Sequence, residues 1–407
     1  MDISLQSVVL FALYLLASRL ALRRLAGTPR DAALAFLNVA AVGYVIYDPH
    51  ESKSVLKLAL YAALAVIQFG LLRLFAEARG WRLALAFFTP IAALIAVRDL
   101  PTAWYQAMVH ALGKQLVDLP TLMGISYFAF RCSRLVLEVR NGSVPRPDFW
   151  QYLGFAFFLP TLAVGPINTY ARHRRGFADA PYSIPIGRAA LRCLVGLVKY
   201  QVLSGIFGQL SYRYFLLDGH AHAWLDLPVV MVVYYLYLYC NFSGFCDMAI
   251  GAAALIGIPV AENFNNPFAA RNIKDFWNRW HITLSQWMRD IVFAPLSKYL
   301  VGLMGPAQAN QAIAITIAVV FLLVGLWHGV AWNFALFGGI HAVGLVTNHY
   351  YTIGLKRMLG RDGFKAYMSS LWIHGAAVVL TFAYCAASLM FFANNLRQIK
   401  EIFGALR

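Results

Sequence analysis

A run of 57 residues, from Tyr299 to Leu355, contains no aspartate, glutamate, lysine or arginine. Soluble proteins are about 25% charged, so a stretch this long without charge does not fit a soluble surface. A membrane-spanning helix needs about 20 predominantly apolar residues. The run is therefore long enough for two spans, and it predicts a chain that lies in a lipid bilayer.

The composition of the whole chain agrees with this prediction. Hydrophobic residues make up 60% of the 407 residues and charged residues only 13%. The two-residue alternation that marks an outer-membrane β-barrel is absent. The composition predicts an all-α polytopic membrane protein and excludes the soluble fold classes. The sequence shows no internal repeat and no low-complexity linker, so we expect a single integral-membrane domain over residues 1–407.

The basic excess predicts the topology. The net charge of +16 comes from 34 lysines and arginines against 18 acidic residues. In a membrane protein such an excess lies mostly in cytoplasmic loops, so it indicates no nucleic-acid partner. Arg23, Arg24 and Arg30 are then cytoplasmic and the N-terminus lies outside. No basic segment precedes the first apolar run, so we expect no cleavable signal peptide.

We expect about ten or eleven spans. They are the first apolar run before Arg23, residues 32–47, 55–74, 83–98, 106–137, 149–170, a span within 187–217, 227–246, two within 299–355 and one within 366–393.

Residues 261–298 do not fit a span, because they are too polar, nor a plain loop, because they are too aromatic. Tryptophans 277, 280 and 287 alternate here with arginines and lysines. A surface amphipathic helix is one interpretation, and a re-entrant element buried in protein at membrane depth is the other. Long apolar segments flank both ends, which favours the partly buried element.

Strongly polar groups inside a membrane protein are costly and mark functional sites. Three clusters qualify: Asn241, Ser243, Cys246 and Asp247; Arg279, His281, Thr283 and Ser285; and Trp327, His328 and Asn333.

Histidine is the natural general base near neutral pH. His328 lies inside the uncharged run, where burial disfavours the protonated imidazole and leaves it able to accept a proton. The alternative is a structural histidine bonded to a carbonyl. We expect His110, His341, His349 and His374 to be structural, and His220 and His222 to lie in a loop.

Other kinds of site lack their signatures. No Gly-x-Ser-x-Gly elbow surrounds a serine, and no Walker, HExxH or EF-hand pattern occurs. The five cysteines have no zinc spacing, so we predict no metal. Asp247 is expected to cap a helix or to pair with an arginine, with ion coupling as the alternative.

Together, these clusters resemble the membrane-bound O-acyltransferase (MBOAT) superfamily. The matching strings are GISYFAFR (124–131), FLPTLAVGPI (158–167), NFSGFCDMAIG (241–251), ENFNNPF (262–268), RNIKDFWNRWHITLSQWMRD (271–290) and LWHGVAWNFALFGGIHA (326–342). The resemblance covers residues 120–350 in the correct order. It implies a recessed core with re-entrant or short helices and a tunnel through the protein.

Within the superfamily, the strings are similar to the bacterial cell-envelope branch. That branch contains the membrane subunit of alginate O-acetylation and the protein that passes D-alanine to teichoic acids. NIKDFWNRWH is similar to the D-alanyl type and FSGFCDMAIG to the acetyl type, so the acyl group stays open between the two. The branch implies the bacterial cytoplasmic (inner) membrane.

The resemblance also implies substrates and partners. The donor is a thioester on the cytoplasmic side, either acetyl-CoA or a phosphopantetheinyl carrier protein, and no cofactor is tightly bound. The acceptor is a hydroxyl of an extracytoplasmic polysaccharide, or of a periplasmic protein that relays the acyl group. Arg271, Lys274 and Arg279 are expected to hold the donor's phosphate or an acidic carrier protein; the alternative is that they only fix the topology.

The resemblance makes His328 the catalytic base and His281 the second active-site residue. His328 would take the acceptor's proton, while His281 would orient a substrate or stabilise developing charge. The expected substrate-binding or supporting residues are Asn241, Ser243, Asp247, Arg271, Arg279, Ser285, Trp327 and Asn333.

A transporter or flippase for an envelope lipid or polysaccharide is the alternative function. Its intramembrane histidines and Asp247 would then relay protons. Such folds commonly carry repeated halves, which this sequence lacks. A non-catalytic assembly scaffold is a second alternative, against which the presence of both His281 and His328 argues.

Overall fold

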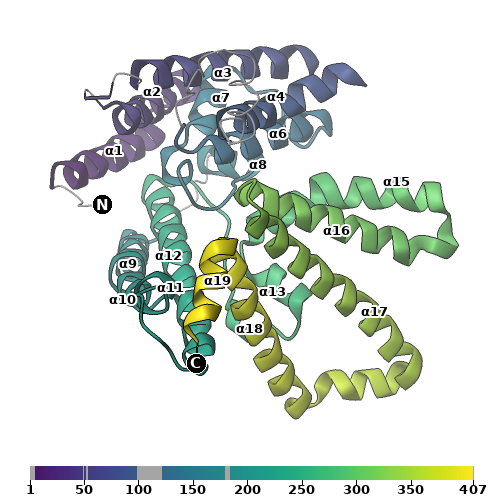
Figure 1. The fold of residues 1–407 in the computed structure, drawn as a ribbon. Helices are drawn as coiled ribbons and strands as arrows, with labels where there is room; N and C mark the ends of the chain where they lie inside the picture. Colours follow the sequence, from purple (N-terminus) through teal and green to yellow (C-terminus); the bar gives the residue numbers. More distant parts are fainter. Residues whose placement is uncertain (1–4, 49, 52–53, 99–121, 179–183, 407) are drawn as a thin grey trace, which may run out of the picture. The chain divides into compact units, whose positions relative to one another are not determined.

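The computed structural model describes residues 5–48, 50–51, 54–98, 122–178 and 184–406 (Figure 1). These residues form helices and no named strand. They group into two compact units, residues 1–196 with 245–261 and residues 197–244 with 262–407. The single-domain organisation stays a prediction.

Seven stretches among the described residues are long and apolar enough to cross a membrane: residues 6–24 (α1, Leu5–Arg24), α2 (Gly27–Ile46), α3 (Ser54–Phe75), residues 186–215, α12 (Asp226–Ile256), residues 306–328 and α18 (Leu371–Ala393). Residues 186–215 comprise α9 (Ile186–Leu197), the π-helix η3 (Val198–Leu203), α10 (Ser204–Gln209) and α11 (Tyr212–Phe215). The protein is thus an all-α polytopic membrane protein.

The expected span at residues 149–170 is not one helix. Residues Phe149–Ala156 form α7, and a 3-10 turn at Leu159–Thr161 follows it. Pro160 lacks a backbone N–H and Gly165-Pro166 favours a bend, so no helix continues through this sequence. The expected span at 83–98 corresponds to α4 (Trp81–Arg98), an apolar helix that is not among these seven stretches because its apolar part is shorter. Most of the span expected at 106–137 lies outside the described residues.

In the first unit, a buried arginine supports the irregular turn after α7. Arg131 of α6 (Ile125–Arg140) is 1% exposed and donates to the carbonyl oxygens of Phe155 and Thr161, at 2.9 and 2.6 Å. Backbone that leaves a helix away from water needs such partners. Arg131 therefore makes a non-helical turn tolerable inside an apolar unit.

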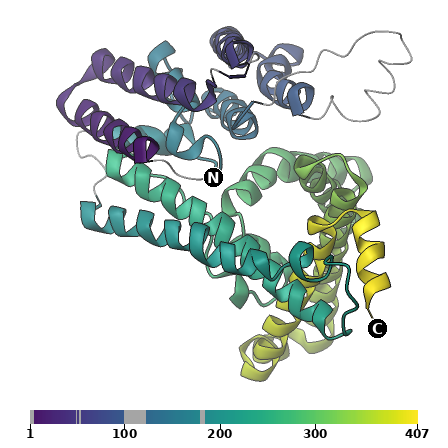
Figure 2. The same cartoon turned by 60° about the vertical axis from the view of Figure 1, so that its left-hand side comes forward.

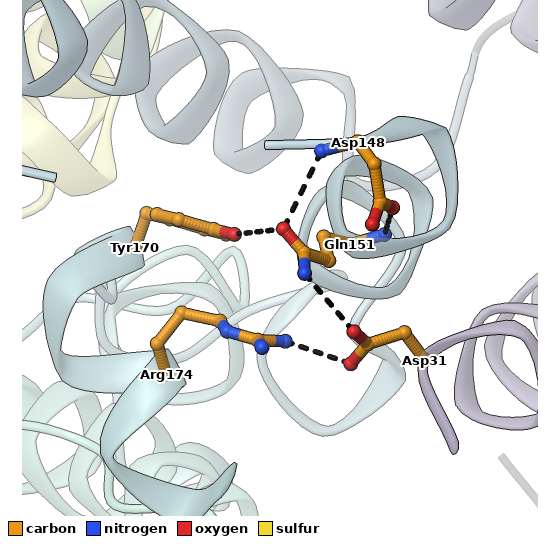
Figure 3. Close-up of polar contacts among 5 residues, drawn as sticks. All are labelled: Asp31, Asp148, Gln151, Tyr170 and Arg174. Carbon is orange, nitrogen blue, oxygen red and sulfur yellow. Dashed lines mark hydrogen bonds and ion pairs between the residues drawn. The ribbon is translucent and has the colours of Figure 1, made fainter. Parts of the chain in front are cut away.

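A second polar network in this unit joins α2, α7 and α8 (Tyr170–Arg174), as Figure 3 shows. The buried carboxylate of Asp31 accepts from Arg174 at 2.8 Å and from the Gln151 amide at 3.1 Å. The Gln151 carbonyl in turn accepts from the Tyr170 hydroxyl at 3.2 Å. Each of these polar groups has a hydrogen-bonding partner on another helix, so the network fixes the three helices to one another.

The second unit contains α13 (Ile273–Arg279), α14 (Ile282–Met288), the π-helix η5 (Arg289–Phe293), α15 (Ala294–Met304), α16 (Ala309–His328), α17 (Trp332–Ser369, with a break at Gly360), α18 and α19 (Leu396–Ala405). Helix α13 contacts both α17 and α18 (Figure 1). Figure 2 shows α19 beside α18 at the C-terminal end.

Helices α16 and α17 approach closely where two glycines face each other. A Cβ atom on Gly325 would lie 2.3 Å from the carbonyl oxygen of Phe334, and one on Gly338 would lie 2.3 Å from that of Phe321. Only glycine allows this separation. The contact fixes His328, which ends α16, relative to α17.

Residues 261–298 form short helices whose aromatic rings face inward. Trp277, Trp280 and Trp287 are all buried, while Arg271 and Lys274 are exposed. Trp280 stacks on Phe276 with 5.6 Å between the ring centroids. This arrangement matches the partly buried element rather than one amphipathic surface helix.

Candidate active site

One cavity of about 60 Å³ lies within the second unit and gathers residues from six helices. Aromatic and aliphatic side chains make up most of its wall. The lining residues are Tyr235, Leu238, Phe242, Phe276, Trp277, Trp280, His281, Leu284, His328, Phe337, His341, Cys385, Ser388, Leu389 and Phe392. Both predicted catalytic histidines, 47 positions apart in the sequence, therefore share one pocket.

His281 lies at a strained point of the backbone. Its φ of 44° and ψ of 52° are left-handed, and among the described residues only Asn266 shares a positive φ without being glycine. Two backbone hydrogen bonds hold this turn: Ile282 N–H to Asn263 O and Asn265 N–H to Arg279 O, both 2.9 Å. Such strain persists where the surroundings over-determine it, and it is concentrated at functional sites.

Asn263 determines which nitrogen of His281 carries the proton. The Asn263 Oδ1 accepts from the Thr283 backbone N–H at 3.2 Å and from the Thr283 hydroxyl at 2.9 Å. It also lies 3.1 Å from Nδ1 of His281. A carbonyl oxygen only accepts, so Nδ1 carries the hydrogen and Nε2 is a bare acceptor.

Burial keeps His281 uncharged. The residue is 3% exposed, and its Nε2 has no hydrogen-bond partner within the described part of the chain. Burial, with a smaller contribution from His328, lowers the pKa of His281 to about 3. At neutral pH the cavity therefore contains a neutral imidazole that can accept a hydrogen bond.

His328 is the last residue of α16, which ends at Gly329. Aromatic rings surround its imidazole: Trp327 at 4.5 Å and Phe392 at 4.8 Å between centroids. A Cβ on Gly329 would lie 2.6 Å from the Phe334 ring. Glycine at this position thus lets an aromatic wall close around the histidine.

Trp327 connects the two histidines. Its ring centroid lies 6.0 Å from that of His281 and 4.5 Å from that of His328. The indole thus lies beside both histidines, although it is not among the residues that line the cavity; its supporting role stays a prediction.

His341 also lines the cavity, but both of its nitrogens are occupied. Its Nδ1 accepts from the Trp277 indole at 3.2 Å, so Nε2 carries the hydrogen, 3.0 Å from the Ser388 hydroxyl. The Ser388 hydroxyl donates in turn to the Cys385 carbonyl at 2.8 Å. This closed chain is that of a structural histidine, the role expected from the sequence.

The α12 cluster reaches the cavity through a different residue from those predicted. Phe242 lines the pocket, and its ring packs edge-on against His281 at 4.8 Å. Asn241 and Ser243 are not among the lining residues, although Ser243 is buried. Asn333, in the first turn of α17, is also buried and outside the lining.

The predicted basic residues mostly support the turn that carries His281. Arg279 pairs with Asp275 at 2.9 Å, and the same carboxylate accepts from the Arg271 backbone N–H at 3.1 Å. The side chains of Arg271 and Lys274 are exposed. Ser285 is half-buried, and its backbone N–H donates to the His281 carbonyl.

Asp247 belongs to the first unit, where its carboxylate pairs with Arg192 at 3.0 Å. This is the arginine pairing that the sequence analysis favoured over ion coupling. In the described ranges, no three histidine, cysteine, aspartate or glutamate side chains are placed to hold a metal ion together.

Asn263 is the site residue that sequence reasoning missed. The string ENFNNPF carried part of the resemblance, but nothing in it distinguishes Asn263 from Asn265 or Asn266. Only the fold shows that Asn263 is 1% exposed and faces His281.

Most of the chain matches the model of one protein family. Residues 56–391, more than four fifths of the chain, match the model of the MBOAT, membrane-bound O-acyltransferase family. The chain belongs to this family. It is therefore an acyltransferase and an integral membrane protein.

Curated relatives of this acyltransferase fall into two groups. The teichoic acid D-alanyltransferase of Streptococcus thermophilus is 30% identical over 69% of this chain and 70% of its own length. The probable alginate O-acetylase AlgI of Azotobacter vinelandii is 29% identical over 70% of this chain, and the peptidoglycan O-acetyltransferase of Helicobacter pylori is 29% identical over 63%. The chain matches about half the length of these two acetylating relatives, at 53% and 46%.

Proposed function

We propose that this O-acyltransferase moves a short acyl group from a cytoplasmic thioester donor to a hydroxyl of an extracytoplasmic envelope glycopolymer, or of a protein that relays the group to it. The family and the named activities of the relatives support acyl transfer to envelope polymers. The observation that carries the proposal is the convergence of His281 and His328 on one cavity.

In the proposed reaction, His328 is the general base. A thioester carbonyl is already electrophilic, and its thiolate is a fair leaving group. The slow part of the reaction is to form the attacking alkoxide, so a base within reach of the acceptor hydroxyl lowers the barrier. His328 takes the hydroxyl proton as the oxygen attacks, and the proton then passes to the departing sulfur.

His281 orients the acceptor in this mechanism. Its Nε2 carries no hydrogen, so it accepts a hydrogen bond and does not donate one to a developing oxyanion. A sugar or polyol acceptor has a second hydroxyl beside the reacting one, and this hydroxyl, at the edge of the cavity, would donate to Nε2. The geometry thus favours orientation over charge stabilisation, the two roles the sequence left open.

The donor is proposed to be acetyl-CoA or a phosphopantetheinyl carrier protein, with no tightly bound cofactor. Exposed cations next to the site, Arg271 and Lys274, are suited to a phosphate or to an acidic carrier surface. Arg279 is less suited, because Asp275 already neutralises it. We place the protein in the bacterial cytoplasmic membrane with its N-terminus outside, on the positive-inside rule.

Label transfer tests the proposal against the transporter alternative. Inside-out membrane vesicles containing the full chain receive acyl-labelled acetyl-CoA or D-alanyl carrier protein. An acyltransferase leaves label in the envelope polymer as an ester that alkali releases. A transporter only moves labelled substrate across the membrane, and label without covalent attachment would overturn the proposal.

A further inference from the structure

We propose that the cavity of His281 and His328 is the acyl subsite and that it takes a small uncharged acyl group, acetyl, in preference to D-alanyl. The inference rests on the proposed function, which leaves the acyl group open. Overall identity does not decide the matter, because D-alanyl and acetyl relatives match this chain at 30% and 29%.

Size is the first argument. An engineered apolar cavity of about 150 Å³ binds benzene, which has six carbon atoms. In proportion, a cavity of about 60 Å³ holds about two or three non-hydrogen atoms. Acetyl has three such atoms and D-alanyl has five. Interiors are close-packed, so two extra atoms require the wall to move.

Charge is the second argument. The amino group of a D-alanyl thioester is an α-amine and is largely protonated at neutral pH. No aspartate or glutamate is among the residues that line the cavity. His281 is neutral, and a neutral imidazole offers an ammonium group a hydrogen bond but no counter-charge. Burial of an unpaired charge is strongly unfavourable.

The two tryptophans of the wall do not replace the missing carboxylate by cation–π binding. Cation–π binding needs the face of a ring to be open to the ammonium group. Trp280 is stacked on Phe276 at an interplanar angle of 23°, and Phe264 packs against it edge-on at 89°. The Trp277 ring packs at steep angles against Phe276 and Phe321, and its N–H donates to His341. These rings pack on one another and build a wall rather than a cage.

Mass balance is simple for an acetyl thioester. The acceptor oxygen forms a bond to the acyl carbon, and the bond from that carbon to sulfur breaks. The hydroxyl proton ends on the thiolate by way of His328. The products are an O-acetyl ester and a free thiol, and no oxidant, reductant or metal takes part.

Three matched donors separate size from charge. Inside-out vesicles containing the full chain receive labelled acetyl, D-lactyl or D-alanyl thioesters, each offered on coenzyme A and on a phosphopantetheinyl carrier protein. Alkali-labile label in polymer and free thiol are both measured. Lactyl has the same number of non-hydrogen atoms as D-alanyl but no charge. We expect the kcat/KM for acetyl to exceed that for D-alanyl by about 100-fold, with lactyl between them.

Each result decides a different statement. D-alanyl transfer equal to or faster than acetyl transfer overturns the inference and leaves the proposed function intact. Lactyl and D-alanyl at equal rates overturn the charge argument. Transfer of none of the three donors, in vesicles that contain folded protein, overturns the proposed function itself.

A variant of the wall tests whether this cavity is the acyl subsite. Leu389→Ala removes a buried lining side chain from α18, and it should raise the lactyl-to-acetyl ratio of kcat/KM by about 10-fold. Leu380→Ala is the matched control, because Leu380 lies on the same helix and is 69% exposed. An unchanged ratio in folded Leu389→Ala would place the acyl group elsewhere.

Discussion

At the scale of single residues, Asn263 determines what His281 is able to do. One side-chain oxygen accepts from two donors of Thr283 and from the imidazole Nδ1, which leaves the buried Nε2 as an acceptor without a partner among the described residues. The strained backbone at His281 is held by the same segment through the Asn263 carbonyl. His281 is therefore oriented by a residue that does not itself line the cavity.

Asn263→Ala removes this acceptor. We expect kcat to fall by about 10- to 100-fold, because a misdirected imidazole loses the productive geometry. The free energy of unfolding should fall by about 1–3 kcal/mol, since three buried donors lose their partner. Initial rates and thermal unfolding in detergent measure both. Asn265→Ala, an exposed change in the same loop, should leave both quantities near wild type.

The depressed pKa of His281 predicts a pH dependence of stability. The unfolded chain has a histidine pKa near 6.5, whereas the folded value is about 3. Below pH 6.5 the unfolded state binds a proton that the folded state excludes. The free energy of unfolding should therefore fall with pH between 6.5 and 3, by up to about 1.4 kcal/mol per pH unit.

His281→Asn supplies the comparison, because asparagine does not titrate and tolerates a left-handed backbone. Between pH 7 and 5, the Tm of the wild-type protein should fall more steeply than that of His281→Asn. Parallel curves would show that His281 titrates alike in both states.

Sequence alone identified the two histidines of the cavity but not their support. His328 stands out because it lies inside the uncharged run next to Trp327, and His281 because of its polar neighbours. Asn263 and the His341–Ser388 pair act through contacts between distant segments, which no local pattern encodes. The sequence favoured an arginine partner for Asp247, but only the fold identifies it as Arg192.

At the scale of elements, the crossing of α16 and α17 sets the position of His328. Gly325 and Gly338 bring the two backbones together, and their Cα atoms leave no room for a methyl group. Glycines are common in membrane-spanning helices whether or not two helices cross there, so the crossing was not predictable from the sequence.

Gly338→Ala should separate these helices. Overpacking of this kind costs about 1–3 kcal/mol, so Tm should fall, and kcat should fall with it because His328 moves. Gly339→Ala is the matched control, since nothing lies within 4 Å of a Cβ at Gly339. Equal effects of the two substitutions on Tm and kcat would contradict a specific helix crossing.

The polar network of α2, α7 and α8 makes a second prediction at this scale. Arg174→Met leaves the Asp31 carboxylate buried without its cation, which should lower the free energy of unfolding by about 3–5 kcal/mol. The double variant Asp31→Asn with Arg174→Met should recover much of that loss. Arg175→Met, at an exposed neighbour, should change little. Thermal unfolding of the wild type and the three variants measures these differences. An unchanged stability of Arg174→Met would refute a stabilising ion pair.

The elements themselves were predicted unevenly. Long uninterrupted apolar runs, such as those of α3, α16 and α18, were found because length and hydropathy suffice for them. The prediction of one span over residues 149–170 was wrong, since apolarity does not show that the helix ends at Ala156, before Pro160. The short helices of residues 261–298 are set by local turn geometry. The composition of this segment indicated only that it was partly buried.

At the scale of the whole molecule, the distribution of charge matters more than its sum. The net +16 is not spread evenly, because basic side chains are concentrated around residues 271–298 while residues 299–355 carry none. The first stretch provides His281 and exposed cations, and the second provides His328 in an apolar wall. One molecule thus combines exposed cations near one histidine with an apolar cavity wall around the other.

The central claim is that His328 takes the proton of the acceptor hydroxyl, and acyl transfer by one variant tests it most directly. Purified His328→Ala, shown to be folded by its thermal transition, is compared with wild type and with His374→Ala, a histidine of α18 outside the cavity. General-base catalysis contributes about 10²- to 10⁴-fold. The initial rate of labelled acyl transfer should therefore fall at least 100-fold in His328→Ala and stay near wild type in His374→Ala. Transfer by folded His328→Ala at close to the wild-type rate would contradict the account.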